Sequence, residues 1–130
     1  MENKLLRITK REKDIMQVLW YSNESLTASS IAEKGNGLSI NTVQAALRSL
    51  IKKKYIEIDN IVYSGTVLTR NYKPIISAER YAANQLQEIR ANTLNFSTLN
   101  FINHLLKKDN LNILDELEDI IKSKKKKEDD

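Results

Sequence analysis

Residues 39–56 are the stretch that most restricts how this chain can fold. Read as a helix, they place apolar side chains on one face at the i, i+3, i+4, i+7, i+8 spacing of a stripe that packs on a core: Val43, Ala46, Leu47, Leu50 and Ile51. The opposite face carries hydrogen-bonding and cationic groups around one small residue: Asn41, Gln44, Ala45, Arg48 and Lys52. The Ser39 hydroxyl is suited to cap the first turn. A helix with short polar groups at its start and lysines at its end is suited to lie in a DNA major groove.

Two shorter helices are expected before this one. Thr9-Lys-Arg-Glu12 has the pattern of a capping box and opens a helix to about Tyr21. Thr27 is expected to cap a helix from Ala28 to about Lys34, and Gly35-Asn-Gly37 to break it, because glycine tolerates positive φ angles. The order helix, helix, turn, helix predicts a helix-turn-helix whose last helix reads DNA.

The hydrophobic period changes after Lys54. Residues 55–59 alternate between apolar and polar, and residues 61–63 and 67–72 do so less regularly, as expected for strands. Ser64-Gly65 is expected to form a hairpin turn, and Pro74 to end the second strand. The sequence therefore predicts a mainly α fold with a small β-hairpin wing, a winged helix-turn-helix domain over residues 1–75.

Three further amphipathic helices are expected: one over about residues 78–94 capped by Ser77, one over about residues 98–107, and a third capped by Asn112. They total about 45 residues, which is too few to bury their apolar stripes in a core of their own. Pairing with a second chain would bury them, so residues 76–123 are predicted to be a helical dimerisation region. Its contacts are expected at Leu99, Ile102, Leu105, Leu106, Ile113, Leu114, Leu117, Ile120 and Ile121. The charged residues 124–130 are expected to be disordered.

Charge and composition exclude several other functions. Residues 1–75 carry 12 Lys and Arg against 7 Asp and Glu, and residues 76–130 carry 9 against 10. Basic charge thus accompanies the candidate reading helix, although a solvated surface often shows the same bias. The absence of cysteine excludes disulfides and thiol catalysis. The sequence shows no nucleophile with a nearby base, no glycine-rich phosphate-binding loop and no cluster of metal ligands, so no enzyme activity, cofactor or metal is expected. Without a signal peptide or a run of roughly 20 apolar residues, a cytoplasmic protein is expected.

Motifs along the chain carry a resemblance to a known family. The chain resembles the penicillinase and methicillin-resistance repressors of Gram-positive bacteria, most strongly through residue 81. The similar segments are Ile8-Thr-Lys-Arg-Glu12, Ile15-Met16, Val18-Leu-Trp20, Leu26-Thr-Ala28, Asn41-Thr-Val43, Leu50-Ile-Lys-Lys53, Tyr72-Lys-Pro74 and Ser77-Ala-Glu-Arg-Tyr81. The resemblance implies a homodimeric winged-helix repressor of a palindromic operator. It also implies release by cleavage at an Asn-Phe bond through a signalling protease, for which Asn100-Phe101 fits the family context better than Asn95-Phe96.

The chain departs from the family near the DNA. Lys54 stands where glycine is usual, Ser49 where arginine is usual, and Leu68 where an arginine is common in the wing. These departures leave Arg70 or Thr66 to contact the DNA backbone, and they leave the operator sequence open. The absence of cysteine argues against the copper-responsive branch of the family.

These observations predict a DNA interface made by one helix with its flanks. Its candidate residues are Thr27, Ser39, Asn41, Thr42, Gln44, Ala45, Arg48, Lys52, Thr66 and Arg70. The start of the helix is expected to read bases or phosphates, and Arg48 and Lys52 to meet phosphates. Thr42 can equally be a packing residue, and residues 52–54 a solubilising run. The alternative function is that of a winged-helix adaptor that binds protein without sequence-specific DNA recognition.

Overall fold

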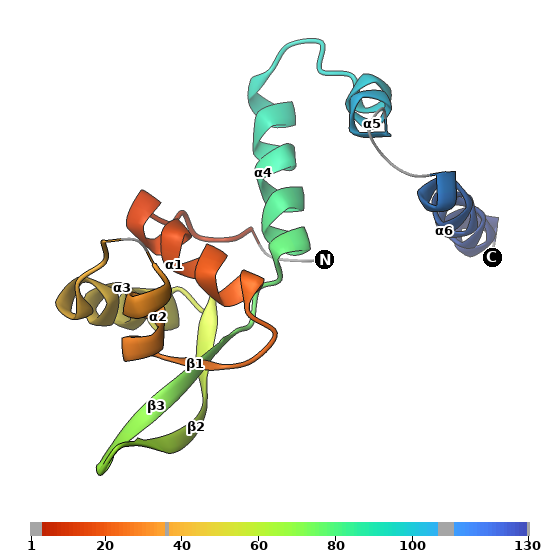
Figure 1. Ribbon diagram of the computed structural model, residues 1–130. Coiled ribbons are helices and arrows are strands. Elements are labelled where there is room, and N and C mark those ends of the chain that lie inside the picture. Colours follow the sequence, from red (N-terminus) through yellow and green to blue (C-terminus); the bar gives the residue numbers. More distant parts are fainter. Residues whose placement is uncertain (1–3, 36, 107–110, 130) are drawn as a thin grey trace. The chain divides into compact units, whose positions relative to one another are not determined.

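The computed structural model describes residues 4–35, 37–106 and 111–129, and it divides into two compact units (Figure 1). The first unit ends at Ala91 and the second begins at Asn92. The expected boundary at residue 75 therefore lies inside the first unit, for a reason given below. Among the described residues, no helix combines the length and the apolar content that crossing a bilayer requires.

Four helices of the first unit begin directly after a hydroxyl residue. They are α1 (Lys10–Tyr21), α2 (Ala28–Lys34), α3 (Ile40–Lys52) and α4 (Ala78–Asn92). The side-chain oxygens of Thr9, Thr27, Ser39 and Ser77 each accept a hydrogen bond from the backbone N–H three residues later, at 3.1–3.2 Å. The Thr9 N–H in turn donates to the Glu12 carboxylate at 2.7 Å, which completes the capping box. The four predicted caps are confirmed.

Three antiparallel strands form the sheet, in the order β1-β3-β2: β1 (Leu26–Thr27), β2 (Ile56–Ser64) and β3 (Val67–Pro74). β2 and β3 make the wing, and β3 ends at Pro74 as predicted. Two expectations were wrong. The segments 55–59 and 61–63 belong to one continuous strand, and the hairpin turn is Gly65-Thr66, because Ser64 still pairs with Val67. Gly65 adopts a φ of +67°, which glycine reaches without strain.

A bulge at Asp59 interrupts the pairing of the wing. Ile58 pairs with Tyr72, and Asn60 pairs with the next residue of β3, Asn71, so Asp59 is the extra residue. Successive side chains of a strand point to opposite faces, and one extra residue shifts this alternation by one. As a result Ile56 and Ile58 before the bulge share a face with Ile61 beyond it. The Asp59 carboxylate accepts hydrogen bonds from the Ser25 hydroxyl and the Lys73 ammonium, which hold the bulge in place.

The core lies between α1, α2, α3 and the base of the sheet. The face of α3 predicted to be apolar is buried at Val43, Ala46, Leu47 and Leu50, while Ile51 is half-buried. The remaining buried members come from α1, β1, α2 and β2 and from the connections before β2 and after β3: Ile15, Met16, Leu19, Leu26, Ala28, Ile31, Tyr55, Ile56 and Ile76.

The first turn of α4 packs on this core. The Tyr81 ring lies 5.4 Å from the Trp20 ring and 6.3 Å from the Tyr55 ring, between centroids. The Trp20 indole N–H donates to the Ile76 carbonyl oxygen at 2.9 Å. These contacts tie the segment after Pro74 to the winged helix, which is why the boundary between the compact units lies at the end of α4.

The second unit contains α5 (Thr98–Leu106) and α6 (Leu111–Asp129). Two expectations fail here. Asn112 lies inside the first turn of α6 and does not precede it, so it is not the cap. The helix also continues through residues 124–129, where disorder was expected. Lysine and glutamate are good helix formers, and the late lysines complement the negative end of the helix dipole. Lys107, the expected end of the preceding helix, and Asp130 lie outside the described residues.

The Glu12 carboxylate joins the start of α1 to the end of α3. Its oxygen lies 2.7 Å from the Lys53 ammonium, and the Glu12 side chain is only 6% exposed. Burial alone would raise the pKa of this carboxyl. Hydrogen bonds from Lys53, Ser49 and the Thr9 N–H outweigh burial and lower the pKa of Glu12 from 4.5 to about 2.

We expect the variant Glu12→Gln to unfold more easily at neutral pH. Because the pKa is lower in the folded state, the carboxylate stabilises the fold above pH 4.5, and this contribution is lost as the pH falls toward 2. The shift corresponds to about 3 kcal/mol of unfolding free energy. Urea titrations followed by Trp20 fluorescence give the free energy of unfolding at each pH. Between pH 4.5 and pH 2 this free energy should fall much less in the variant than in the wild-type protein. Glu33→Gln, at an exposed carboxylate of α2, is the control, and an unchanged acid dependence in Glu12→Gln would contradict the assignment.

Candidate nucleic-acid interface

The face of α3 opposite the core is open to solvent. All five of its predicted polar-face residues are exposed: Asn41, Gln44, Ala45, Arg48 and Lys52. Since the core side of the helix is fully packed, the helix cannot rotate to hide these groups. The Arg48 and Lys52 side chains make no ion pair within the described part of the chain. Two cations are therefore presented to solvent along with amide donors and acceptors.

The start of α3 is organised by two hydroxyls. The Ser39 hydroxyl accepts from the Thr42 N–H at 3.2 Å and donates to the Thr42 hydroxyl oxygen at 2.8 Å. Thr42 is half-buried, whereas Ser39 is exposed. Thr42 therefore takes part in the structure of the first turn, and the Ser39 side chain is shared between capping and the surface. The N–H groups of this turn and the positive end of the helix dipole favour an anion near Ser39.

The lysine run at the end of α3 has a divided role. Lys53 binds Glu12, so it belongs to the internal ion pair. Lys52 and Lys54 are exposed on either side of it. Lys54 adopts a φ of +65°, the left-handed conformation that ends many helices and that glycine adopts most easily. Lysine therefore adopts here a backbone conformation that glycine reaches with less strain.

The predicted wing residues lie on the hairpin beyond the core. Thr66 is exposed in the hairpin turn, and Arg70 is exposed on β3. Lys73, nearer the base of β3, lies 3.3 Å from the Asp59 carboxylate and 3.5 Å from that of Glu57. The Asp59 hydrogen bond raises the pKa of Lys73. Lys73 therefore keeps its positive charge but pairs it with two carboxylates, whereas Arg70 makes no ion pair with any described residue.

Thr27 lies apart from the exposed face of α3. It pairs with Asn71 in the sheet, and its hydroxyl both accepts from the Ser30 N–H and donates to the Ser30 hydroxyl at 3.1 Å. Thr27 is half-buried, so its main role within the structure is to start α2. The structure therefore brings the α3 residues together on one face and places Thr27, Thr66 and Arg70 on neighbouring elements.

Several exposed residues near this face were not among the predicted DNA-binding residues. Ile40 is 39% exposed one turn before Gln44, and Lys54 is exposed just after the helix. On the wing, Ile61, Tyr63 and Leu68 are all more than half exposed. In the wing, the sequence shows apolar residues on both sides of the break in the apolar–polar alternation. That alternation alone does not show which of these residues lie beyond the core and are exposed.

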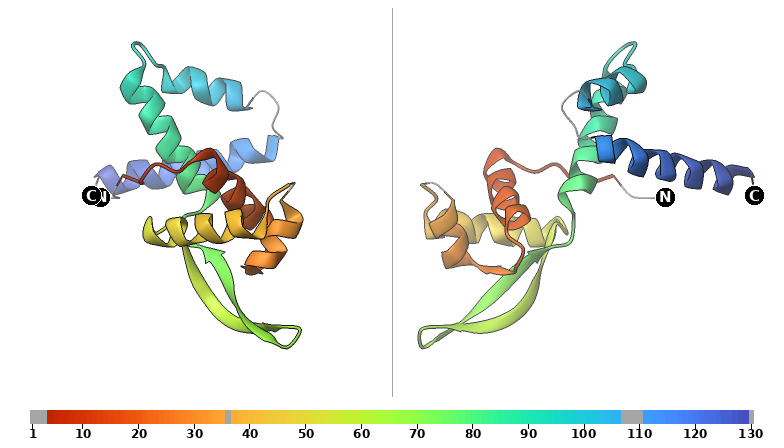
Figure 2. Two further views of the ribbon diagram at one scale, coloured as in Figure 1. Left: turned by 90° about the vertical axis from the view of Figure 1, so that its left-hand side faces the viewer. Right: turned by 45° about the vertical axis from the view of Figure 1, so that its right-hand side comes forward.

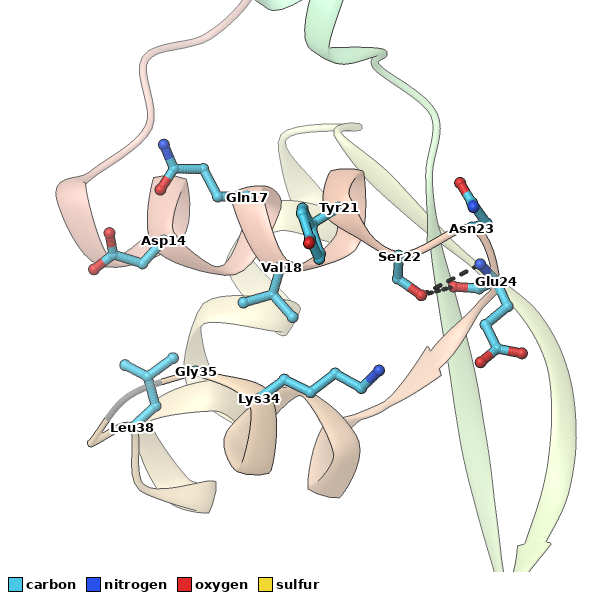
Figure 3. A pocket seen from close by; sticks show the side chains of 10 residues that line it. All are labelled: Asp14, Gln17, Val18, Tyr21, Ser22, Asn23, Glu24, Lys34, Gly35 and Leu38. Atoms are coloured by element: carbon cyan, nitrogen blue, oxygen red, sulfur yellow. Dashed lines mark hydrogen bonds between the residues drawn. The ribbon is translucent and has the colours of Figure 1, made fainter.

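A surface groove of about 1090 Å³ lies between α1 and the connection from α2 to α3 (Figure 3). It is lined by Asp14, Gln17, Val18, Tyr21, Ser22, Asn23, Glu24, Lys34, Gly35 and Leu38. None of the predicted DNA-binding residues lines it. In the described ranges, His, Asp and Glu residues nowhere gather in the threes that a metal ion would need.

The apolar residues of α5 and α6 remain largely uncovered within the chain. Six of the predicted contact residues are exposed: Leu99, Leu105, Ile113, Leu114, Ile120 and Ile121. Ile102, Leu106 and Leu117 are half-buried. The most exposed of them is Leu99, at 80%. A group of exposed apolar side chains of this size is unusual on a protein surface and indicates a contact with a partner.

The two Asn-Phe bonds occupy different structures. Asn95-Phe96 lies between α4 and α5, where Asn95 has a φ of +64°. Asn100-Phe101 lies in the first turn of α5, and Ser97 caps that turn by accepting from the Asn100 N–H at 3.1 Å. The Phe96 and Phe101 rings are 6.3 Å apart, between centroids. Asn100 and Phe101 are both exposed.

The family model described as penicillinase repressor matches residues 8–125. No match was found among curated proteins. The adhesin competence repressor (AdcR) from Streptococcus pyogenes is 18% identical with a TM-score of 0.42, over 93% of this chain and 80% of that one. GAS PerR-Zn-Zn is 23% identical with a TM-score of 0.41, over 54% of this chain and 45% of that one. Neither structural likeness is close enough to carry a conclusion about function.

Proposed function

The chain belongs to the penicillinase repressor family of DNA-binding transcriptional repressors, and we propose that it acts as a homodimer on a palindromic operator. The observation that carries the proposal is the exposed face of α3. There the amide side chains of Asn41 and Gln44 lie beside Arg48 and Lys52, which make no ion pair with any described residue, and the opposite face packs on the core. Such a face matches the donors, acceptors and phosphates that line a major groove. The protein would act in the cytoplasm, where the operator is.

Each part of the interface has a role in this proposal. Asn41 and Gln44, near the start of α3, read base edges, because amide groups can pair bidentately with adenine. Arg48 and Lys52 neutralise phosphates along the groove. Ser39, Thr42 and Thr27 lie at helix starts, where backbone N–H groups favour phosphate. Ala45 allows close approach to the bases, and Thr66 and Arg70 contact the backbone beside the groove.

The proposed dimer rests on the uncovered apolar side chains of α5 and α6. No residue of α5 is buried within the chain, although the helix contains five large apolar side chains. Burial between two copies would remove this surface from water at about 25 cal/mol per Å². A two-fold dimer would present two α3 helices to two half-sites, which accounts for a palindromic target.

Release from the operator is proposed to follow cleavage at Asn100-Phe101 after a protease signal. The cut would separate Phe101 and every later contact residue from the winged helix. α4 would stay with the winged helix, since Tyr81 packs on its core. Loss of the second DNA-binding unit weakens binding by up to several orders of magnitude, because the second contact no longer benefits from a high effective concentration.

Salt titrations on DNA test the recognition proposal. The probe is a duplex that the protein itself selects from a randomised pool, compared with a scrambled duplex. We expect Arg48→Ala to lower the slope of log K against log salt by about 1, and Gln44→Ala to relax the base preference at one position. Arg90→Ala, on α4, should change neither. Equal wild-type affinity for both duplexes would refute sequence recognition and favour the protein-binding adaptor.

Charge substitutions in α6 test the dimer. Leu114 and Ile121 are both nearly half exposed and lie two turns apart on one face. We expect the double variant Leu114→Glu/Ile121→Glu to be monomeric in sedimentation equilibrium, because two buried charges per chain oppose association. The control Glu116→Gln/Ser123→Gln has the same spacing at exposed polar positions and should remain dimeric. A monomeric wild-type protein, or a dimeric double variant, would show that these residues are not the interface.

Matched phenylalanine variants test the cleavage site. Phe101→Ala and Phe96→Ala each remove one ring of the same aromatic pair, so their structural effects are similar. In induced cells we expect fragments of the wild-type protein and of Phe96→Ala, with masses that place the cut after Asn100. Phe101→Ala should stay intact. Unchanged processing of Phe101→Ala, or a cut after Asn95, would contradict the proposed site.

A further inference from the structure

The segment that leads into α1 and the first turn of that helix are rich in positive charge. Residues 4–13 contain five Lys and Arg but only one carboxylate, Glu12, which is buried and bound to Lys53. Four of the cations are exposed around the start of α1 and are called the basic surface below: Arg7, Lys10, Arg11 and Lys13. None of the four forms an ion pair within the described ranges of the chain. The basic surface therefore presents its charge to solvent.

Three of these cations lie where they oppose folding. Lys10, Arg11 and Lys13 belong to the first turn of α1, and the N-terminal end of a helix carries a partial positive charge of its own. Cations at this end destabilise the helix, and cations three residues apart also repel one another. A negatively charged partner would relieve both effects. The position of these side chains thus indicates binding, since it does not benefit the fold.

Two contacts hold the basic surface against the end of α3. The Glu12 carboxylate lies 2.7 Å from the Lys53 ammonium. The Tyr55 hydroxyl, two residues further along the chain, donates to the Leu6 carbonyl oxygen at 2.5 Å. Because one contact lies within the first turn of α1 and the other lies before it, both parts of the basic surface are fixed next to the residues that follow α3.

The start of α1 and the exposed side of α3 belong to the same face of the winged helix (Figure 2). In the left view, α3 crosses the middle of this face, the start of α1 lies above it, and the hairpin extends below it. Lys52 and Lys54 are exposed at the end of α3. Positive charge therefore continues from the reading helix to the start of α1, on the side of α3 away from the wing.

This continuity indicates what the partner is. Four exposed cations on two successive segments suit a partner that carries several negative charges in a row. The same partner must be able to run past α3, because the basic surface adjoins the end of that helix. A DNA duplex has one negative charge per roughly 1.7 Å of its axis and continues beyond whatever segment a single helix reads.

Resting on the proposed function, we propose that the basic surface binds the phosphate backbone of the operator outside the segment read by α3, on the side away from the wing. Phosphate contacts position a protein on DNA and carry no sequence information. The contact therefore raises affinity for every duplex by the same factor. It also lengthens the bound DNA beyond the bases that α3 and the wing can reach.

Neutralising the cations tests whether they oppose folding. We expect the double variant Lys10→Gln/Arg11→Gln to raise the urea midpoint of unfolding by about 0.5 M, because repulsion by the helix dipole is removed. Glutamine has nearly the helix propensity of lysine and arginine, so charge is the main change. The control Lys34→Gln/Arg90→Gln removes the same charge from the last turns of α2 and α4, where cations are favourable, and its midpoint should not rise. A midpoint that falls in both variants would remove the basis of the proposal.

Salt titrations with the same two variants test the DNA contact. The full chain is titrated onto the duplex it selects from a randomised pool and onto a scrambled duplex. We expect Lys10→Gln/Arg11→Gln to bind both duplexes roughly tenfold more weakly, with the slope of log K against log salt lowered by about 2 and the preference between them unchanged. Lys34→Gln/Arg90→Gln should match the wild-type protein.

Uncharged methylphosphonate linkages locate the contact on the DNA. Placed in the flank beyond the segment read by α3, they should weaken binding of the wild-type protein but hardly affect Lys10→Gln/Arg11→Gln. If that variant binds DNA like its control, or if the linkages weaken both proteins equally, the proposed contact is wrong while recognition by α3 stands. If the wild-type protein prefers neither duplex, the repressor proposal itself fails.

Discussion

The Glu12 carboxylate accepts hydrogen bonds from donors in two separate parts of the winged helix. It holds the Thr9 N–H at the start of α1 and the Lys53 ammonium just after α3. A buried carboxylate left without these partners would cost several kcal/mol, so the start of α1 and the end of α3 cannot move apart independently. Because the core fixes the rotation of α3 and this ion pair fixes its end, the exposed side of that helix is determined by interactions on its hidden side.

Local interactions could be predicted from the sequence. The caps at Thr9, Thr27, Ser39 and Ser77 each depend on a hydrogen bond three residues away, and the buried face of α3 depends on a period of 3.6 residues. The polar side chains of α3 were placed on the exposed face for the same reason. Both kinds of pattern are complete within one segment of chain, so no knowledge of the fold is needed to read them.

Interactions between distant segments could not be predicted. Lys53 looked like one of three equivalent lysines, because its partner lies 41 residues earlier. β1 has only two residues and exists because β3 lies beside it. Tyr81 was read as part of a separate region, since its contacts with Trp20 and Tyr55 arise only when the chain folds back. In the wing, the alternation broke at Asp59, and sequence alone does not distinguish an interrupted strand from a bulged one.

The bulge at Asp59 also limits how the wing can change length during evolution. If two residues are added to β2, every side chain of the strand stays on its own face of the hairpin. If one residue is added or lost beyond the bulge, every later side chain of β2 moves to the opposite face. Ile61 and Tyr63 would then face away from α3, while their partners on β3 would not. Wings of related proteins should therefore differ by even numbers of residues per strand, unless a bulge is gained or lost at the same time.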